Sequence, residues 1–283
     1  MSKKKEKSEN SFLGFLYNTA LGRFFLKPLK SRTVSKIAGK FLDSRLSKSL
    51  IKGFVKKNNI NLDDFYSDSF RCFNDCFSRR IKEGLRPIDE SPDALISPCD
   101  SLLTAYKIND DTRLTVKGVE YSVSDLLQNG ELSSEFCGGV CLVFRLCVNH
   151  YHRYVYFDSG NKGENLFIKG KLHTVRPIAL AAGPVFRENC REYTVMNTDN
   201  FGKAVQIEVG AMLVGKIKNH HGEHTFRRGE EKGTFLYGGS TIILLLKSDA
   251  AEVDEKFFLA TERGEEIDVK MGEKIGEKII QNA

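Results

Sequence analysis

The chain has 283 residues, which is enough for one large domain or two small ones, and its hydrophobic fraction of 41% is ordinary for a folded protein. The net charge of +6 hides an asymmetry: residues 1–60 hold 15 Lys and Arg against 3 Asp and Glu, a balance of +12, whereas the remainder holds 28 basic and 34 acidic residues, a balance of −6. The seven cysteines are an odd number, no secretory signal precedes them, and their spacing fits zinc poorly. We therefore expect reduced thiols in a cytosolic protein, with no metal site.

Residues 1–60 are expected to form a basic helical arm. The first ten residues, rich in Lys and Glu, predict disorder, and the apolar residues 12–26 are too few and too interrupted to span a bilayer. Beyond Pro28, apolar residues recur at helical spacing; they are Val34, Ile37, Ala38, Phe41, Leu42 and Leu46. Such a basic amphipathic helix either docks on an anionic membrane surface or packs on its own domain with its lysines in water. No nucleic-acid-binding motif accompanies it, so we expect no nucleic acid partner.

Residues 61–283 are expected to form the body of the protein. A helix is predicted over residues 63–82, with Phe70, Phe73, Phe77 and Ile81 on one face. Short apolar runs separated by glycines follow and are typical of strands; they cover residues 113–123, 139–148, 154–157, 205–217, 234–237 and 241–247. This pattern predicts an α+β fold, with N-terminal helices followed by a predominantly antiparallel, barrel-like β domain.

The segment 237–241, Tyr-Gly-Gly-Ser-Thr, precedes a buried strand and is the candidate reactive centre. Glycine before Ser240 leaves the Gly239 carbonyl open and permits a strained backbone. The Ser240 hydroxyl can then attack that carbonyl in an N-to-O acyl shift. β-Elimination of the ester would cut the chain and leave a pyruvoyl group, which traps amines as Schiff bases. Taken alone, Gly-Gly-Ser before a strand is more typical of a turn or a bulge.

Four further motifs accompany this segment, in residues 97–100, 151–153, 207–217 and 228–235. In order and spacing, the five motifs closely resemble those of the phosphatidylserine decarboxylases, over about residues 12–275. The resemblance implies a proenzyme that cuts itself between Gly239 and Ser240 into residues 1–239 and 240–283. It also implies that the pyruvoyl group made from Ser240 is the covalent cofactor, that no metal is needed, and that phosphatidylserine loses CO₂ to give phosphatidylethanolamine.

The resemblance also assigns roles around Ser240. Asp100 matches the aspartate that orients a histidine base, in the manner of a serine-protease triad, although Ser101 stands where the family usually has glycine. His152 matches the histidine of the family's Tyr-His-Arg motif. We expect it to protonate the substrate Cα or to position the departing carboxylate.

One position departs from the family pattern. Typical members carry a second histidine three places after the first, as the base for self-cleavage, and here that place holds Val155. Either His152 serves both reactions, or another histidine fills the vacancy. We predict that His173 does, since residues 170–177 resemble a family segment, although Arg176 replaces its usual asparagine. The other candidates, His220, His221 and His224, lie in a polar stretch that predicts an exposed loop.

Two other interpretations stay open. A serine hydrolase could use Ser240, Asp100 and a histidine, but the chain lacks a Gly-x-Ser-x-Gly elbow. An inactive relative that lost its base at Val155 could simply bind lipid surfaces. The decarboxylase interpretation implies a peripheral protein on the cytoplasmic face of the cell membrane, with the arm of residues 1–60 facing the lipid. Its expected partners are phosphatidylserine in an anionic membrane surface and its own two cleavage chains, and a homodimer is a further option.

Overall fold

The computed structural model describes residues 19, 24, 32–67, 69–116, 118–175, 177–211, 216–236 and 240–280. Several sequence predictions concern residues outside these ranges. They are the disorder of residues 1–10, the apolar segment 12–26 except residues 19 and 24, part of the strand predicted over residues 205–217, Arg176, and the Tyr-Gly-Gly part of the reactive segment.

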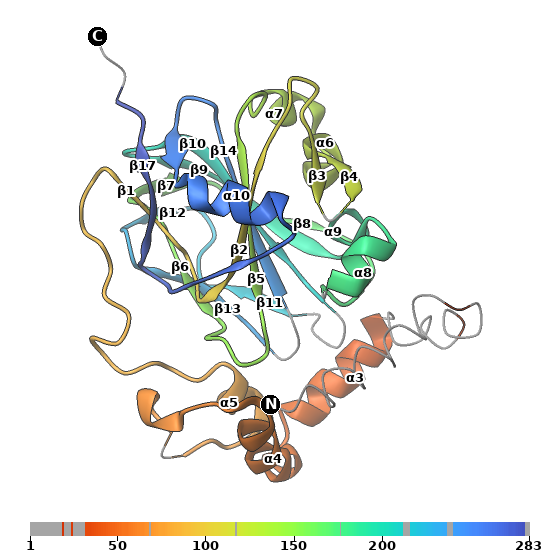
Figure 1. Cartoon of the computed structure of the whole chain (residues 1–283). Coiled ribbons are helices and arrows are strands. Elements are labelled where there is room, and N and C mark those ends of the chain that lie inside the picture. The colour runs from red at the N-terminus through yellow and green to blue at the C-terminus, as the bar shows by residue number, and fades with distance from the viewer. Residues whose placement is uncertain are drawn as a thin grey trace.

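A large antiparallel sheet forms the centre of the molecule, with strands in the order β12-β7-β9-β10-β14-β5-β2-β16 and with β8 paired to β9 (Figure 1). These strands are β2 (Ser101–Lys107), β5 (Val140–Leu146), β7 (Gly160–Lys162), β8 (Leu166–Ile168), β9 (Arg191–Thr198), β10 (Gly202–Val209), β12 (His224–Phe226), β14 (Ser240–Leu246) and β16 (Ile267–Val269). The predicted α+β class is confirmed. Among the described strands the sheet does not close, because β12 and β16 remain its two ends, so the barrel-like expectation is not confirmed.

Smaller antiparallel sheets flank the large one. One has the order β1 (Ala94–Ile96), β17 (Lys274–Lys278) and β15 (Ala251–Val253), and another the order β11 (Ile217–Asn219), β13 (Glu231–Phe235) and β6 (Arg153–Val155). Strands β3 (Arg113–Val116) and β4 (Val119–Ser122) form a hairpin. Gly118 in its turn has a φ of 79°, a conformation that favours glycine. The two strands predicted over residues 113–123 are therefore confirmed.

Two apolar cores cover the two faces of the large sheet. Alternate residues of β14 enter each one, with Ile243 and Leu245 in the first core and Ile242 and Leu244 in the second. The first core also takes side chains from α6 (Val123–Leu127), α8 (Pro177–Ala182) and α9 (Val185–Glu188), with α7 (Gly130–Ser134) beside α6. The second takes them from α10 (Glu255–Glu262) and the β1-β17-β15 sheet. Because both faces are covered, every residue of β14 is buried, including Ser240.

The sequence suggested that the helices would be grouped at the N-terminal end. This grouping is incomplete, because α6 to α10 lie in the body of the protein. The N-terminal helical elements are α3 (Arg32–Leu42), η1 (Arg45–Lys48), α4 (Ser49–Asn58), η2 (Leu62–Asp64) and α5 (Phe73–Phe77). Helices α3, α4 and α5 lie together below the sheet in Figure 1. The amphipathic helix predicted near residues 34–46 is present as α3. Leu42 is buried, but Ile37 and Phe41 on the same helix are 65% and 47% exposed.

The helix predicted over residues 63–82 is wrong except for residues 73–77. Backbone bonds join its two ends: Tyr66 N donates to Arg80 O and Lys82 N to Asp64 O, each at 2.9 Å. A continuous helix would hold residues 65 and 81 about 24 Å apart, so this pairing excludes it. The aromatic periodicity was real only for Phe73 and Phe77, which pack together on α5.

None of the described helices is long and apolar enough to cross a membrane. All seven cysteines are free thiols, and six of them are buried or half-buried.

Candidate active site

Ser240 is the first residue of β14, and it pairs in register with Leu146 of β5. Its side chain faces the second core, because Ile242 and Leu244 lie on the same side of the strand. The residue is 0% exposed, and its Oγ has no hydrogen-bond partner among the described residues. A buried hydroxyl without a partner costs about 1–3 kcal/mol, so its presence calls for an explanation such as a chemical role.

His152 precedes β6 directly and is also 0% exposed. Its Nδ1 lies 2.9 Å from the carbonyl oxygen of His150, and because a carbonyl only accepts, the ring proton is on Nδ1. The other ring nitrogen, Nε2, has no hydrogen-bond partner among the described residues. Burial, with a further contribution from the charge of Arg79, lowers the pKa of His152 well below 6.5. The imidazole is therefore neutral and presents a lone pair, which is the form of a general base.

Helix α5 and the residues after it hold this imidazole. The ring of Phe77 packs on the His152 ring with centroids 4.0 Å apart. Arg79, itself buried, donates from Nη2 to the carbonyls of Asn149 and His150 at 2.9 and 3.1 Å. On the other side, the carbonyl of His152 accepts from Phe235 N at 2.9 Å. Since Phe235 ends β13, His152 is anchored to the strand that leads towards Ser240.

Asp100 lies immediately before β2 and is 3% exposed. Arg86 donates to both of its carboxylate oxygens, from Nε to Oδ1 at 2.7 Å and from Nη2 to Oδ2 at 2.5 Å. Oδ1 also accepts from the backbone N of Met271 at 3.0 Å. The described hydrogen bonds of Asp100 thus go to an arginine and a backbone amide and not to His152 or His173.

The sheet register brings Asp100 and Ser240 to the same end of the sheet. Leu102 of β2 pairs with Arg145 of β5, which in turn pairs with Thr241 of β14. Adjacent strands are about 4.8 Å apart, so the beginnings of β2 and β14 are separated by roughly 10 Å. A group acting between Asp100 and Ser240 would have to bridge that gap.

His150, to which the sequence analysis gave no role, lies close to this gap. Its Nδ1 accepts from Cys147 N at 3.1 Å, and its Nε2 is 3.9 Å from Oδ2 of Asp268. Burial lowers the pKa of His150, while the carboxylates of Asp268 and Asp100 act in the opposite direction. Of the signals in the sequence, only its position two residues before His152 pointed to it.

His173 is engaged elsewhere through its ring, although its backbone reaches the same end of the sheet. Nε2 of His173 lies 2.9 Å from Oε2 of Glu188. The Asn189 side chain accepts from His173 N at 2.7 Å and donates to the carbonyls of His173 and Gly210 at 2.9 and 2.8 Å. Gly210 directly follows Val209, the residue of β10 that pairs with Thr241. His173 is therefore tied to the strand beside β14, but its imidazole lies against the carboxylate of Glu188.

Comparison with known proteins agrees with the motifs around Ser240. Residues 73–277 match the family model described as phosphatidylserine decarboxylase. The chain belongs to the phosphatidylserine decarboxylase family. It is 45% identical over 270 residues to phosphatidylserine decarboxylase proenzyme 2 of Clostridium acetobutylicum, covering 95% of this chain and 92% of the relative. It is 42% identical over 271 residues to the phosphatidylserine decarboxylase proenzyme of Ruminiclostridium cellulolyticum (93% and 90%), and 40% identical over 273 residues to that of Clostridium perfringens (94% and 93%).

Val155 stands at the position where, from the family pattern, we expected a second histidine. Its side chain is 4% exposed and packs in an apolar cluster with Phe65, Tyr151 and Met271. Val155 therefore contributes to packing and cannot take up a proton. The described histidines close to this end of the sheet are left to supply any base that self-cleavage needs.

Proposed function

We propose that the chain is a phosphatidylserine decarboxylase proenzyme that cuts its own backbone between Gly239 and Ser240. The observation that carries this is the pair of buried, unpartnered atoms, Ser240 Oγ and His152 Nε2, among the described residues. The match to the family along most of the chain, and the word proenzyme in the names of its relatives, support it.

In this proposal the Ser240 hydroxyl attacks the carbonyl of residue 239, and a base takes up the hydroxyl proton. The neutral His152, with its lone pair on Nε2, is suited to that task. His173 remains the alternative that the sequence suggested, but it would first have to release Glu188. Asp100 is paired with Arg86, so its carboxylate would neutralise the charge of that arginine. It would influence the site only through its own negative charge.

Ser240 fits the precursor of the proposed cofactor, because its buried hydroxyl has no hydrogen-bond partner among the described residues and is available for the attack. β-Elimination would then carry this oxygen away in the carboxylate of residue 239, and water would convert the remaining dehydroalanine to the pyruvoyl group with release of ammonia. A pyruvoyl group at this position would supply an electrophilic carbonyl and an electron sink for decarboxylation. His152 would hold a proton near the substrate Cα only after taking one up at Nε2, since burial keeps its ring neutral. Strand β14, paired with both β10 and β5, would keep residues 240–283 attached to residues 1–239 after the cut.

The mass of the purified protein tests this function against its two alternatives. We expect two chains, residues 1–239 and 240–283, with the second refractory to N-terminal sequencing because it has no free amine. Ser240→Ala should remain a single chain and lack decarboxylase activity. An active enzyme of the full 31.9 kDa would indicate a serine hydrolase or another chemistry, and an intact, inactive chain would indicate a lipid-binding relative.

We also propose that α3 and η1 dock on the anionic, cytoplasmic face of the cell membrane, where phosphatidylserine is presented. Ile37 and Leu46 are 65% and 77% exposed, which is costly for a surface that only meets water. Exposed basic side chains surround them, namely Lys36, Lys40, Arg45 and Lys48. Each Lys or Arg near an anionic bilayer contributes about 1 kcal/mol. A homodimer remains part of the proposal, and the mass of the native particle in detergent would test it.

A further inference from the structure

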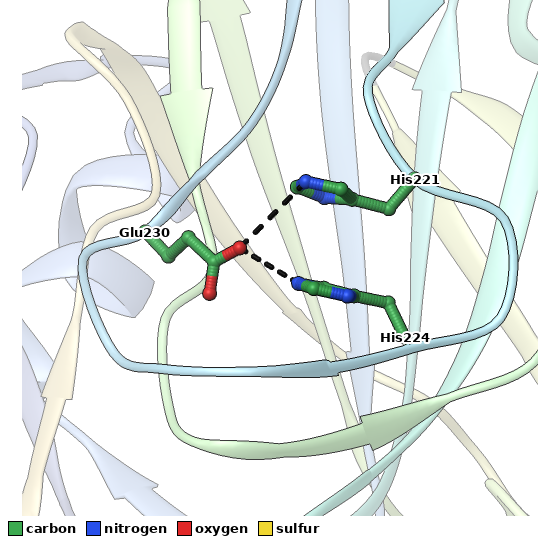
Figure 2. A group of neighbouring side chains, drawn as sticks. All are labelled: His221, His224 and Glu230. Carbon is green, nitrogen blue, oxygen red and sulfur yellow. Dashed lines mark hydrogen bonds and ion pairs between the residues drawn. The ribbon is translucent and has the colours of Figure 1, made fainter.

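Two histidines and a glutamate converge in the connection between β11 and β13. In the sequence this connection comes before β13, whereas the reactive segment comes after it. The three residues are His221, His224 and Glu230 (Figure 2). One ligand atom from each lies within 4.8 Å of those of the other two. The side chains are 29%, 30% and 32% exposed, so an ion could reach them from solvent. The stretch that the sequence predicted as an exposed loop is thus partly buried at these groups, and His224 begins β12.

The three groups point to a common centre. Nε2 of His224 lies 2.7 Å from Oε1 of Glu230, and Nε2 of His221 lies 3.7 Å from the same oxygen. In Figure 2 both rings extend towards the Glu230 carboxylate, and they are stacked with centroids 3.9 Å apart and planes inclined by 16°. Ligand atoms around a tetrahedral Zn²⁺ are about 3.4 Å apart, given bonds of about 2.0–2.2 Å. Side-chain shifts of under about an ångström would reach that geometry.

Surrounding groups orient these ligands as in a built metal site. Tyr156 Oη lies 3.3 Å from Nδ1 of His221, so Nδ1 can donate its proton to Tyr156 and leave Nε2 for a metal. The second oxygen of Glu230 accepts from Arg227 N at 3.0 Å, which leaves Oε1 directed at the histidines. The carbonyl of His221 accepts from Asn165 Nδ2 at 2.7 Å and from Lys162 Nζ at 3.1 Å, and these bonds hold the backbone of the loop.

We propose that His221, His224 and Glu230 bind one Zn²⁺ ion or a similar transition-metal ion, with solvent at the remaining position. Two imidazoles and one carboxylate suit Zn²⁺, whereas Mg²⁺ prefers oxygen ligands alone. Binding replaces the direct contact between Nε2 of His224 and Oε1 of Glu230, because both atoms turn to the ion. The ion would clamp β12 to the beginning of β13 and so stabilise this edge of the fold. This site does not depend on decarboxylation, so it can be tested by binding alone.

The test uses the untagged full-length protein, stripped with a chelator and titrated with Zn²⁺ by calorimetry and equilibrium dialysis. We expect one Zn²⁺ per chain and no comparable binding of Mg²⁺. His221→Gln, His224→Gln and Glu230→Gln should each weaken Zn²⁺ binding by at least tenfold. Tyr156→Phe should weaken it by about tenfold, the usual effect of losing an outer hydrogen bond. The matched control is His220→Gln, a neighbour whose ring is paired with Glu231 at 2.6 Å, and it should bind Zn²⁺ like the wild type.

Bound Co²⁺ gives a second measurement that does not rely on variants. Its visible spectrum should be that of a nitrogen and oxygen site, without the thiolate charge-transfer band that coordination by the chain's free cysteines would give. Zn²⁺ should also raise the thermal midpoint of the wild type and of His220→Gln, because a ligand that binds only the folded state stabilises it, but not that of His224→Gln. Absence of Zn²⁺ binding, wild-type Zn²⁺ affinity in the three ligand variants, or a thiolate band would each overturn the proposal.

Discussion

A hydrogen bond of 2.9 Å joins Nδ1 of His152 to the carbonyl oxygen of His150 and fixes the imidazole proton on the side away from Nε2. A short stretch of backbone therefore decides which nitrogen of His152 is available for chemistry. The contrast with His173 is direct, since its Nε2 is occupied by the Glu188 carboxylate at 2.9 Å. We therefore propose His152 as the base for self-cleavage, whereas the sequence pattern suggested His173.

Substitution of the two histidines should separate these assignments. If His152 is the base, His152→Gln should slow self-cleavage by about 10²–10⁴-fold, the usual contribution of a general base, and the uncut precursor should accumulate. His173→Gln should cleave at nearly the rate of the wild type. The measurement is the fraction of precursor on a denaturing gel as a function of time after synthesis.

His150→Gln tests the third histidine close to this end of the sheet, whose Nδ1 is bonded to Cys147 N, and it should cleave at nearly the rate of the wild type. The opposite pattern, with uncut precursor only in His173→Gln and a cut but inactive His152→Gln, would assign the base to His173. Circular dichroism of each precursor would show that the variants are folded.

The lowered pKa of His152 predicts a pH dependence of stability. Burial, followed by the Arg79 charge, holds the folded pKa well below 6.5, and the unfolded ring has a pKa of about 6.5. Below that pH the unfolded state binds more protons, so this contribution to stability is present above about pH 6.5 and is lost as the pH falls. Between about pH 7.5 and 5.5 it should amount to about 1.4 kcal/mol. Urea unfolding of the uncut Ser240→Ala protein would measure it.

In the Ser240→Ala background, His152→Gln should reduce that pH dependence by about the same amount, because a glutamine does not titrate in this range. The dependence that remains belongs to other groups, among them His150, whose pKa is also lowered by burial. An unchanged slope would mean that His152 takes up protons as readily in the folded protein as in the unfolded one, and would contradict the lowered pKa that this assignment relies on.

The ion pair between Lys232 and Glu208 predicts a large effect on stability. Both side chains are 0% exposed, and Nζ of Lys232 lies 2.7 Å from Oε1 of Glu208. Lys232→Met should therefore cost about 3–5 kcal/mol in the free energy of unfolding, because it leaves a buried carboxylate without its cation. The double variant Lys232→Met, Glu208→Gln should recover part of this loss. Denaturant titration of the uncut protein measures both.

The matched control is the exposed pair of Arg113 and Glu120, whose side chains are 51% and 60% exposed. Arg113→Met should cost under about 1 kcal/mol, as for other surface ion pairs. If Lys232→Met and Arg113→Met lost equal amounts of stability, water would have to reach Lys232, contrary to its burial.

The membrane proposal predicts that charge on α3 controls vesicle binding. Lys36→Glu with Lys40→Glu should weaken binding to vesicles that contain anionic lipid by at least about thirtyfold, since two charges worth about 1 kcal/mol each are lost and reversed. Binding of the wild type should also fall as salt rises, because exposed charges are screened within about 10 Å at 0.1 M. Co-sedimentation with vesicles measures both effects.

A control with the same change in net charge is Lys169→Glu with Lys256→Glu, two exposed lysines outside the N-terminal helices. It should bind vesicles nearly like the wild type. Equal losses in the two double variants would attribute binding to net charge, and no loss in either would show that α3 only packs on its own domain.

Several features were readable from local sequence. The strands over residues 139–148 and 241–247 were predicted because a buried strand needs only a short run of apolar residues, and Ser240 stood out because glycines and a hydroxyl residue precede that run. The basic amphipathic helix followed from spacing alone. The helix over residues 63–82 failed because a helical period cannot show that residues 64–66 pair with residues 80–82.

The site divides in the same way. Residue types and their order along the chain determined the family, the candidate nucleophile and the replacement of a histidine by Val155, because these properties belong to single positions. Tertiary structure alone decided that Arg86 neutralises Asp100, that His150 orients His152, that Glu188 occupies His173, and that His221, His224 and Glu230 converge. These are contacts between side chains and backbone whose geometry depends on strand register and burial. Because protonation and metal affinity depend on ångström-scale distances, only the folded chain could set them.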